Sequence, residues 1–316
     1  MAPETLRLGT RGSRLALWQA ERVSALLRER HPALVVEPVV IETVGDRVLD
    51  TALSKIGDKG LFTAELEQAL RERRIDAAVH SLKDLPTELP ADLALGAVLD
   101  REDPRDALVS REGKRLHELA PGTRVGTSSL RRRAQLLSAH PQLVAADLRG
   151  NVPTRLEKVA RGDVEAAILA RAGLQRLGLG SRVTEVLEPE QMLPAPGQGA
   201  LAIERRADDA AVAARLDALD DPATRLATAA ERALLARLEG GCQVPVGALA
   251  TITPTGLRLE GLVADPEGSR VLRDALEGAP RGPEESARLG AALGERLLAA
   301  GADAILAALR ATGGAA

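Results

Sequence analysis

Two stretches of the sequence follow one plan: RLGTRGS at residues 7–13 and RVGTSSL at residues 124–130. In each, a short apolar run ends in a polar turn, and the residues that follow have the apolar spacing of a helix. A second pair of similar segments, IDAAV at 75–79 and VEAAI at 164–168, has the composition of buried strands in a sheet flanked by helices. These repeated segments predict two related lobes of the α/β class.

Local signals predict the first elements of the chain. Apolar residues recur at helical spacing from Ala16 to Leu27, and Ser13 stands where an N-cap is expected. This helix is expected to end near His31. Residues 34–41 then form a predicted strand, which Pro38 places at a sheet edge or a bulge.

The last third of the chain has a different pattern, and Asp221-Pro222 marks the predicted boundary. Residues 228–238 are expected to form a helix, followed by three strands joined by turns and a final amphipathic helix. The expected strands are 246–253, 257–264 and 270–276, and the expected helix is 283–299. This pattern predicts a small α+β domain with a three-stranded antiparallel sheet.

The composition excludes several classes of partner. The formal charge of -3 excludes a generally basic protein that coats nucleic acid. With one Trp, one Phe and no Tyr, the chain also has almost no aromatic side chains on which bases could stack. No run approaches about twenty apolar residues, and the first residues lack the pattern of a signal peptide. The single cysteine, Cys242, cannot form an internal disulfide. We therefore expect a cytoplasmic protein with no nucleic-acid or membrane partner.

The sequence also argues against several kinds of chemistry. It has no Gly-rich phosphate loop ending in Gly-Lys-Ser/Thr and no Gly-x-Gly-x-x-Gly after a strand, so a nucleotide cofactor is not expected. The four histidines show no metal-ligand spacing, and no metal site is expected. The histidines are His31, His80, His117 and His140.

Basic residues gather at turns that precede helices, where backbone N–H groups and the helix dipole favour anions. Arg11 and Ser13 open the first helix of one lobe, and Ser128, Ser129, Arg131 and Arg132 open that of the other. Arg149 and Arg155 flank Asn151. One such cluster fits a solvated helix face. Several clusters at equivalent turns of two lobes favour a cleft for a polyanion with small carboxylates or phosphates.

Two residues are candidates for chemistry. Asp84 follows an apolar strand and is the one candidate acid–base group of the cleft, although it also fits a surface ion pair with Lys83. Cys242 follows Gly240 and Gly241 at the end of a helical stretch, which favours a tether or nucleophile over the packing role common for free cysteines.

Eight motifs together resemble the porphobilinogen deaminases, also called hydroxymethylbilane synthases. They are RGS 11–13, KGLF 59–62, HSLKDLP 80–86, REDPRD 101–106, GTSSLRR 126–132, LRGN 148–151, GQGA 197–200 and EGGC 239–242. Each is a modest signal, but their occurrence in order over residues 11–245 is specific. The C-terminal domain carries no motif of its own.

The resemblance implies a fold, a reaction and a cofactor. Two lobes like those of type II periplasmic binding proteins would comprise residues 1–99 with 200–217 and residues 100–199, and the third domain residues 222–316. A dipyrromethane, attached by a thioether to Cys242, would prime the head-to-tail joining of four porphobilinogen molecules into hydroxymethylbilane. The protein would act as a monomer on this small-molecule substrate.

The resemblance also implies site residues. Asp84 would stabilise the cationic azafulvene and move protons. The cofactor would be bound by Cys242, Ser81, Lys83, Thr127, Ser129, Arg131, Arg132 and Arg155. The substrate would be bound by Arg11, Ser13, Gln19, Arg149 and Arg155, with Lys55, Lys59 and Phe62 in a loop over the cleft.

Two alternatives remain open at this stage. A non-catalytic binder of small dicarboxylates would have the same two lobes and would need neither Asp84 nor Cys242. A hydrolase would use Cys242 as its nucleophile and His80 as its base.

Overall fold

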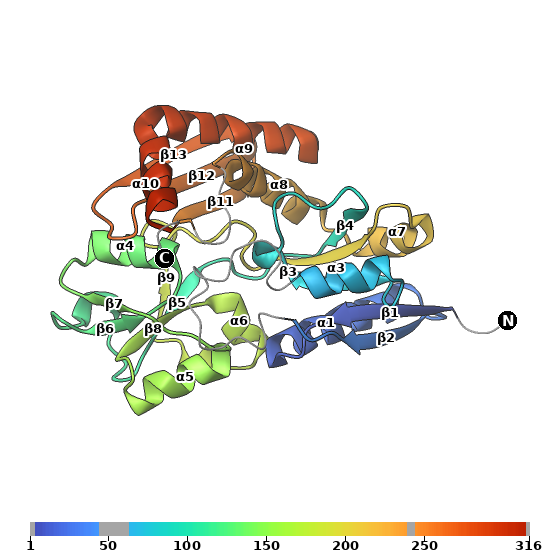
Figure 1. The fold of residues 1–316 in the computed structure, drawn as a ribbon, viewed down its shortest axis with the longest axis horizontal. Coiled ribbons are helices and arrows are strands. Elements are labelled where there is room, and N and C mark those ends of the chain that lie inside the picture. Colours follow the sequence, from blue (N-terminus) through green and yellow to red (C-terminus); the bar gives the residue numbers. More distant parts are fainter. Residues whose placement is uncertain (1–3, 44–62, 239–243, 314–316) are drawn as a thin grey trace.

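The computed structural model describes residues 4–43, 63–238 and 244–313. It comprises two lobes that lie side by side, with a third domain packed over them (Figure 1). Within the described residues, no helix is long and apolar enough to cross a membrane.

The first lobe is built on a five-stranded sheet in the order β2-β1-β3-β10-β4. Strands β1, β2 and β3 are parallel, whereas β10 runs antiparallel to both of its neighbours, β3 and β4. The strands are β1 Thr5–Thr10, β2 Val35–Val40, β3 Ala77–Ser81, β4 Leu93–Val98 and β10 Leu201–Arg206. The helices are α1 Arg14–Arg30, α3 Ala64–Arg71, the short 3-10 helix η2 Leu82–Asp84, and α7 Ala210–Leu216. The predicted helix after Ser13 and the predicted edge strand containing Pro38 are both confirmed.

The second lobe repeats this arrangement with the order β7-β6-β8-β5-β9. Strand β5 runs antiparallel to β8 and β9, as β10 does in the first lobe. The strands are β5 Asp106–Ser110, β6 Arg124–Gly126, β7 Val144–Ala146, β8 Ala166–Ala170 and β9 Glu185–Leu187. The helices are α4 Leu130–Ala139, α5 Val152–Arg161 and α6 Arg171–Arg176, and the 3-10 turns are η3 Leu116–Glu118 and η4 Gly180–Arg182. The repeated segments form equivalent strands, β1 with β6 and β3 with β8, so the prediction of two related α/β lobes is confirmed.

Side-chain caps explain where the helices facing the site begin. Ser13 accepts a hydrogen bond from the backbone N–H of Ala16, and Ser129 accepts one from that of Arg132. Asn151 caps α5 in the same way, with Pro153 in its first turn. Each such cap is worth about 1 kcal/mol, because it satisfies an N–H group that has no partner within the helix.

The third domain packs helices against an antiparallel sheet in the order β11-β12-β13, as predicted. Its elements are α8 Pro222–Arg237, β11 Val246–Thr253, β12 Gly256–Ala264, β13 Val271–Gly278, α9 Pro283–Leu297, the π-helical turn η6 Leu298–Ala302 and α10 Asp303–Gly313. Helix α8 begins six residues before the expected Thr228, because Asp221 caps it and Pro222 fits its first turn. Leu234, Leu259, Val263 and Leu293 are at the centre of the apolar core.

A buried carboxylate on α8 fastens the third domain to both connections between the lobes. Glu231 pairs with Arg101 through two hydrogen bonds of 2.7 and 3.0 Å. It also accepts the backbone N–H of Gly197 at 2.7 Å and that of Ala250 at 2.8 Å. Residues 101 and 197 lie in the two crossovers, β4 to β5 and β9 to β10. The third domain is therefore held where the lobes join.

The lobes also contact each other directly. The guanidinium of Arg176 on α6 lies 5.7 Å from the centre of the Trp18 ring on α1, and its Nη2 donates to the Gly199 carbonyl at 2.6 Å. The cation–π contact joins α6 to α1, and the hydrogen bond to Gly199 holds the residues before β10 against the second lobe.

Candidate functional site

The candidate site lies where β3 of the first lobe ends beside the second lobe. The turn η2, directly after β3, carries Lys83 and Asp84, both half-buried. A cavity at this point is lined by Arg11, Ser13, Gln19, His80, Ser81 and Asp84, among others. The structure therefore brings together the first-lobe residues predicted from the motifs at 11–13 and 80–86.

The first-lobe wall is held by local hydrogen bonds. Gln19 is buried on the face of α1 toward β3, and its Nε2 donates to the Ser81 hydroxyl at 2.8 Å. Ser13 uses its hydroxyl to cap α1. Gln19 and Ser81 therefore fix the end of β3, directly before the residues of η2.

The second-lobe wall carries two arginines at the start of α5. Arg155 is half-buried, and its Nε donates to the Gly150 carbonyl at 2.7 Å. Desolvation, and then the charges of Arg132 and Arg149, lower the pKa of Arg155 to about 10, while Asp84 acts in the opposite direction. The Nη1 of Arg149 is buried with no hydrogen-bond partner among the described residues. The two arginines therefore give this wall an excess of positive charge.

A second arginine pair, at the start of α4, has an internal partner. Asp106 on β5 is fully buried and accepts from Arg131 Nη1 at 2.8 Å and from Arg132 Nη2 at 2.7 Å. The same arginines donate to the carbonyls of Leu193 and Ile168. Although desolvation opposes it, the two guanidiniums hold the pKa of Asp106 well below its usual range. Direct contact of Arg131 and Arg132 with a ligand stays a prediction, because the structure gives both an internal role.

Gln198 connects this buried centre to Lys83. Its Nε2 donates to Asp106 at 2.8 Å and to the Pro104 carbonyl at 2.7 Å, and its Oε1 accepts from Lys83 Nζ at 3.3 Å. Desolvation lowers the pKa of Lys83 to about 8; Asp84 and Asp106 raise it, and Arg132 and Arg131 lower it further. Sequence reasoning assigned no role to Asp106 or Gln198, although both are part of quoted motifs.

Other predicted residues have supporting positions or lie outside the described structure. Thr127 is buried, and its hydroxyl accepts from the Ser129 backbone at 3.2 Å, so it shapes the turn before α4. The predictions for Cys242, Lys55, Lys59 and Phe62 fall on residues outside the described ranges. Before Cys242, the last described residue is Leu238, which directly follows α8.

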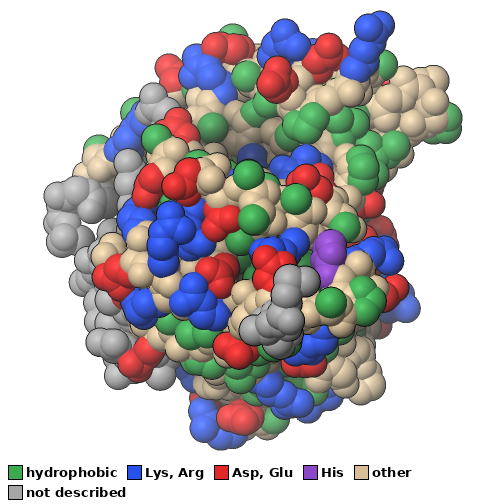
Figure 2. Space-filling model, turned by 90° about the vertical axis from the view of Figure 1, so that its right-hand side faces the viewer, with side chains coloured by type: hydrophobic (Ala, Val, Ile, Leu, Met, Phe, Trp, Pro, Cys, Tyr) green, Lys and Arg blue, Asp and Glu red, His purple; other side chains and the backbone are tan. Residues whose placement is uncertain are grey.

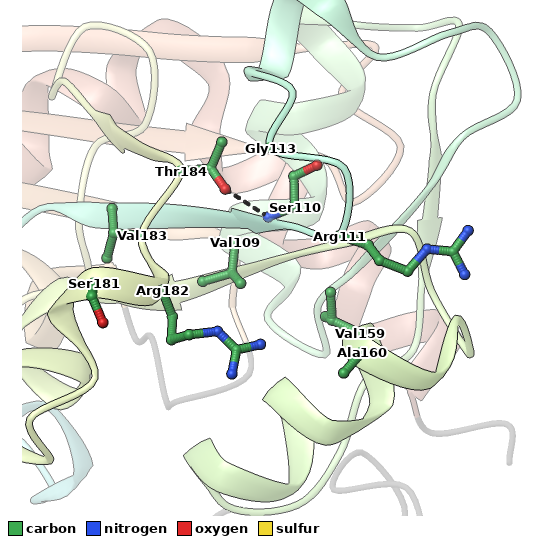
Figure 3. Close-up of a pocket in the computed structure, with 10 residues that line it drawn as sticks. All are labelled: Val109, Ser110, Arg111, Gly113, Val159, Ala160, Ser181, Arg182, Val183 and Thr184. Atoms are coloured by element: carbon green, nitrogen blue, oxygen red, sulfur yellow. Dashed lines mark hydrogen bonds between the residues drawn. The ribbon is translucent and has the colours of Figure 1, made fainter.

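A second pocket lies on the outer part of the second lobe, between α5, β5 and the turn before β9 (Figure 3). Arg111 and Arg182 line it, but their side chains point in different directions. Their guanidiniums therefore do not converge on one ligand. None of the predicted site residues lines this pocket.

The geometry of the inter-lobe site suits a ligand that carries several carboxylates. Cations from both lobes surround one carboxylate, Asp84, and a guanidinium nitrogen of Arg149 is buried without a partner in the described chain. A charge-assisted hydrogen bond to such a group contributes about 1.5–3 kcal/mol. Asp84 is placed to stabilise positive charge or to move a proton between these cations.

Comparisons with known proteins match nearly the whole chain. The family model described as "Porphobilinogen deaminase, dipyromethane cofactor binding domain" matches residues 6–214, and "Porphobilinogen deaminase, C-terminal domain" matches residues 225–299. The porphobilinogen deaminase of Chromobacterium violaceum is 54% identical over 96% of this chain and 97% of its own. That of Pelotomaculum thermopropionicum is 52% identical over 95% of this chain and 96% of its own.

Solved structures with a similar fold are more distant. The methionine-binding protein MetQ has a TM-score of 0.44 at 15% identity, over 69% of this chain and 90% of its own. The BenM effector-binding domain with benzoate has a TM-score of 0.44 at 19% identity, over 69% of this chain and 91% of its own. By the family models and the near full-length relatives, this chain belongs to the porphobilinogen deaminase family.

Proposed function

We propose that this chain is a transferase of porphyrin biosynthesis that joins four porphobilinogen molecules head to tail into hydroxymethylbilane, as hydroxymethylbilane synthases do. The observation that carries this proposal is the charge arrangement of the inter-lobe site. Asp84 of the first lobe interacts electrostatically with Lys83 and with Arg155 of the second lobe. Porphobilinogen combines two carboxylate side arms with a ring that becomes cationic when ammonia leaves, so it needs cations and one carboxylate together.

The residues present also fit a dipyrromethane group, which carries carboxylate side arms of the same kind. Within the described residues, Arg149 Nη1 is buried without a partner. Desolvation, and then the charges of Arg132 and Arg149, lower the pKa of Arg155, so a carboxylate side arm bound here would stabilise its charged form. Lys83 and Arg155 would hold these carboxylates, and Cys242 would provide the thioether. When bound, the group supplies the free pyrrole α-carbon to which the first substrate is joined.

The chain's own residues would divide the work. Arg11 and Ser13 on the first lobe, with Arg149 on the second, would bind substrate carboxylates. Gln19 and Ser81 would orient the turn that carries Asp84. As a carboxylate, Asp84 would stabilise the cation that forms when the C–N bond of the substrate breaks. The monomeric state and cytoplasmic location expected from the sequence remain part of this proposal.

The test is turnover of porphobilinogen, followed by release of ammonia and formation of the bilane. Wild-type protein should be active, and Asp84→Asn should lose activity by a factor on the order of 10²–10⁴, the usual contribution of an acid–base group. Asp208→Asn is the matched control, because Asp208 is exposed and makes only a surface ion pair with Arg73 at 3.7 Å. An inactive wild type that binds small dicarboxylates would instead support the non-catalytic binder.

A further inference from the structure

A buried acid–base pair lies beneath the site and has no part in the function proposed above. His80 Nε2 and Glu204 Oε2 are 3.0 Å apart, and the two side chains are 4% and 0% exposed. They come from neighbouring antiparallel strands, β3 and β10. Burying two ionisable groups is costly unless they are paired, so a side chain pair of this kind is unusual in a lobe core.

The strand register fixes which face of the sheet the pair occupies. His80 is opposite Ala202, and Glu204 is opposite Ala78, so both side chains lie on one face. Ala78 packs with Leu66 and Leu70 of α3 on that face. The charged neighbours from α3 are already engaged: Glu67 accepts from Thr63 at 2.8 Å, and Arg71 pairs with Asp92 at 2.7 Å.

These contacts leave His80 as the partner of Glu204. The Oε2 of Glu204 faces the imidazole, and its Oε1 is buried without a partner in the described chain. A carboxylate only accepts hydrogen bonds, so the pairing with Glu204 favours the tautomer of His80 in which Nε2 carries the proton. A carboxylate that fixes the tautomer of a histidine in this way is the arrangement of an oriented general base.

His80 also belongs to the wall of the reaction cavity. His80 lines that cavity together with Asp84, Arg11, Ser13, Gln19 and Ser81. No described residue forms a hydrogen bond with Nδ1, and Nδ1 is not among the buried unpartnered atoms. The charged groups on this side are Asp84 and Arg11. A histidine held by a buried carboxylate therefore lies in the wall of the cavity that Asp84 also lines.

We propose that His80, oriented by Glu204, is a second proton-transfer group of this site, an inference that rests on the proposed function. In each addition the C–N bond of the substrate breaks and ammonia leaves with the electron pair. The α-carbon of the neighbouring pyrrole then forms the new C–C bond, and its C–H electron pair returns to the ring. The proton goes to His80 Nδ1 and from there to solvent.

A second group would let Asp84 keep its negative charge throughout the addition. Asp84 stabilises the cation only while it is charged, and it would lose that charge by taking the proton. A neutral imidazole can take the proton, and Glu204 then stabilises the imidazolium. The distribution of tasks follows from the environments: Asp84 lies among cations, and His80 lies against a buried anion.

The decisive variant is His80→Asn, because the Asn amide can still donate to Glu204 but cannot take a proton. It should fold as the wild type and lose about 10²-fold or more in turnover. Substrate deuterated at its free α-carbon should show a larger kinetic isotope effect with this variant than with the wild type. His117→Asn is the matched control, since His117 is exposed on η3, and it should change neither quantity.

Two further measurements separate proton transfer from a structural role. Added imidazole should restore part of the turnover of His80→Gly, and ¹⁵N NMR of the wild type should show Nε2 protonated and Nδ1 unprotonated for neutral His80. The NMR result needs no variant to fold. Near-normal turnover and isotope effect in His80→Asn, failure of imidazole rescue, or the opposite tautomer would each overturn this inference. A wild type without turnover would overturn the proposed function itself.

Discussion

The second lobe carries two arginine pairs that look equivalent in the sequence but have different partners in the structure. Arg131 and Arg132 are buried around Asp106 and form part of the protein's internal structure. Arg149 Nη1 has no partner in the described chain, and desolvation, followed by the charges of Arg132 and Arg149, lowers the pKa of Arg155. A guanidinium with an internal carboxylate supports the fold, whereas one without such a partner is available to a ligand.

The largest effect expected from this difference is on stability. Asp106→Asn removes the charge that two buried guanidiniums share, and it should lower the free energy of unfolding by about 3–5 kcal/mol. Urea denaturation measures this change. Asp163→Asn, which removes an exposed ion pair with Arg161, should cost less than about 1 kcal/mol. Equal losses of stability in the two variants would show that the buried ion pairs of Asp106 stabilise the fold no more than an exposed one does.

The cleft arginines should show the opposite behaviour. Arg149→Gln should leave the free energy of unfolding within about 1 kcal/mol of the wild type, because no internal ion pair is lost. It should weaken substrate binding by about 1.5–3 kcal/mol, or roughly 10- to 100-fold in KM. Arg133→Gln is the control, because Arg133 pairs with Glu267 at 2.9 Å outside the cleft. An unchanged KM for Arg149→Gln would remove this residue from the binding site.

Lys83 contacts Gln198, which in turn contacts Asp106. Its lowered pKa predicts a smaller, pH-dependent effect on the free energy of unfolding. The pKa of Lys83 is lowered from 10.5 to about 8, so between these values the unfolded chain binds more protons than the folded one. Stability relative to Lys83→Met should therefore rise as pH increases from 8 to 10.5 and stay constant below 8. Denaturation of both proteins across this range measures the difference. A constant difference over the whole range would contradict the desolvation of Lys83.

The smallest expected effect concerns the helix that carries the internal pair. Ser129→Ala removes the cap of α4 and should cost about 1 kcal/mol of stability, with Ser13→Ala on the equivalent α1 costing a similar amount. Thermal unfolding of the two variants tests whether the lobes are equivalent at this level. A large loss in only one of them would show that its serine does more than cap a helix.

The sequence predicted the elements and the architecture because their signals are local. The Ser13 cap, the repeated strand segments and the proline of β2 act within a few residues, and the structure has them where they were expected. The pairing of charges is not local. Asp106 is 25 residues from Arg131 and 92 from Gln198, and Gln198 is 115 from Lys83. The connections from β4 to β5 and from β9 to β10, which pass between the lobes, bring these residues together. No local pattern shows which arginines will pair with a buried carboxylate.

Figure 2 shows how charged side chains are distributed over one face of the molecule. Basic and acidic side chains are interspersed over this face of the molecule. Composition predicted that the protein is not generally basic, and the face drawn has no uniformly basic area. The number of charged residues is therefore less informative than which of them lack a partner.

The central claim is that a dipyrromethane, covalently attached to Cys242, provides the end on which the product grows between the two lobes. Denaturing mass spectrometry of the purified protein tests it most directly. The wild type should be heavier than its sequence by one dipyrromethane, and Cys242→Ser should have the mass of its sequence. A wild type that keeps the unmodified mass, even after incubation with porphobilinogen, would contradict the claim.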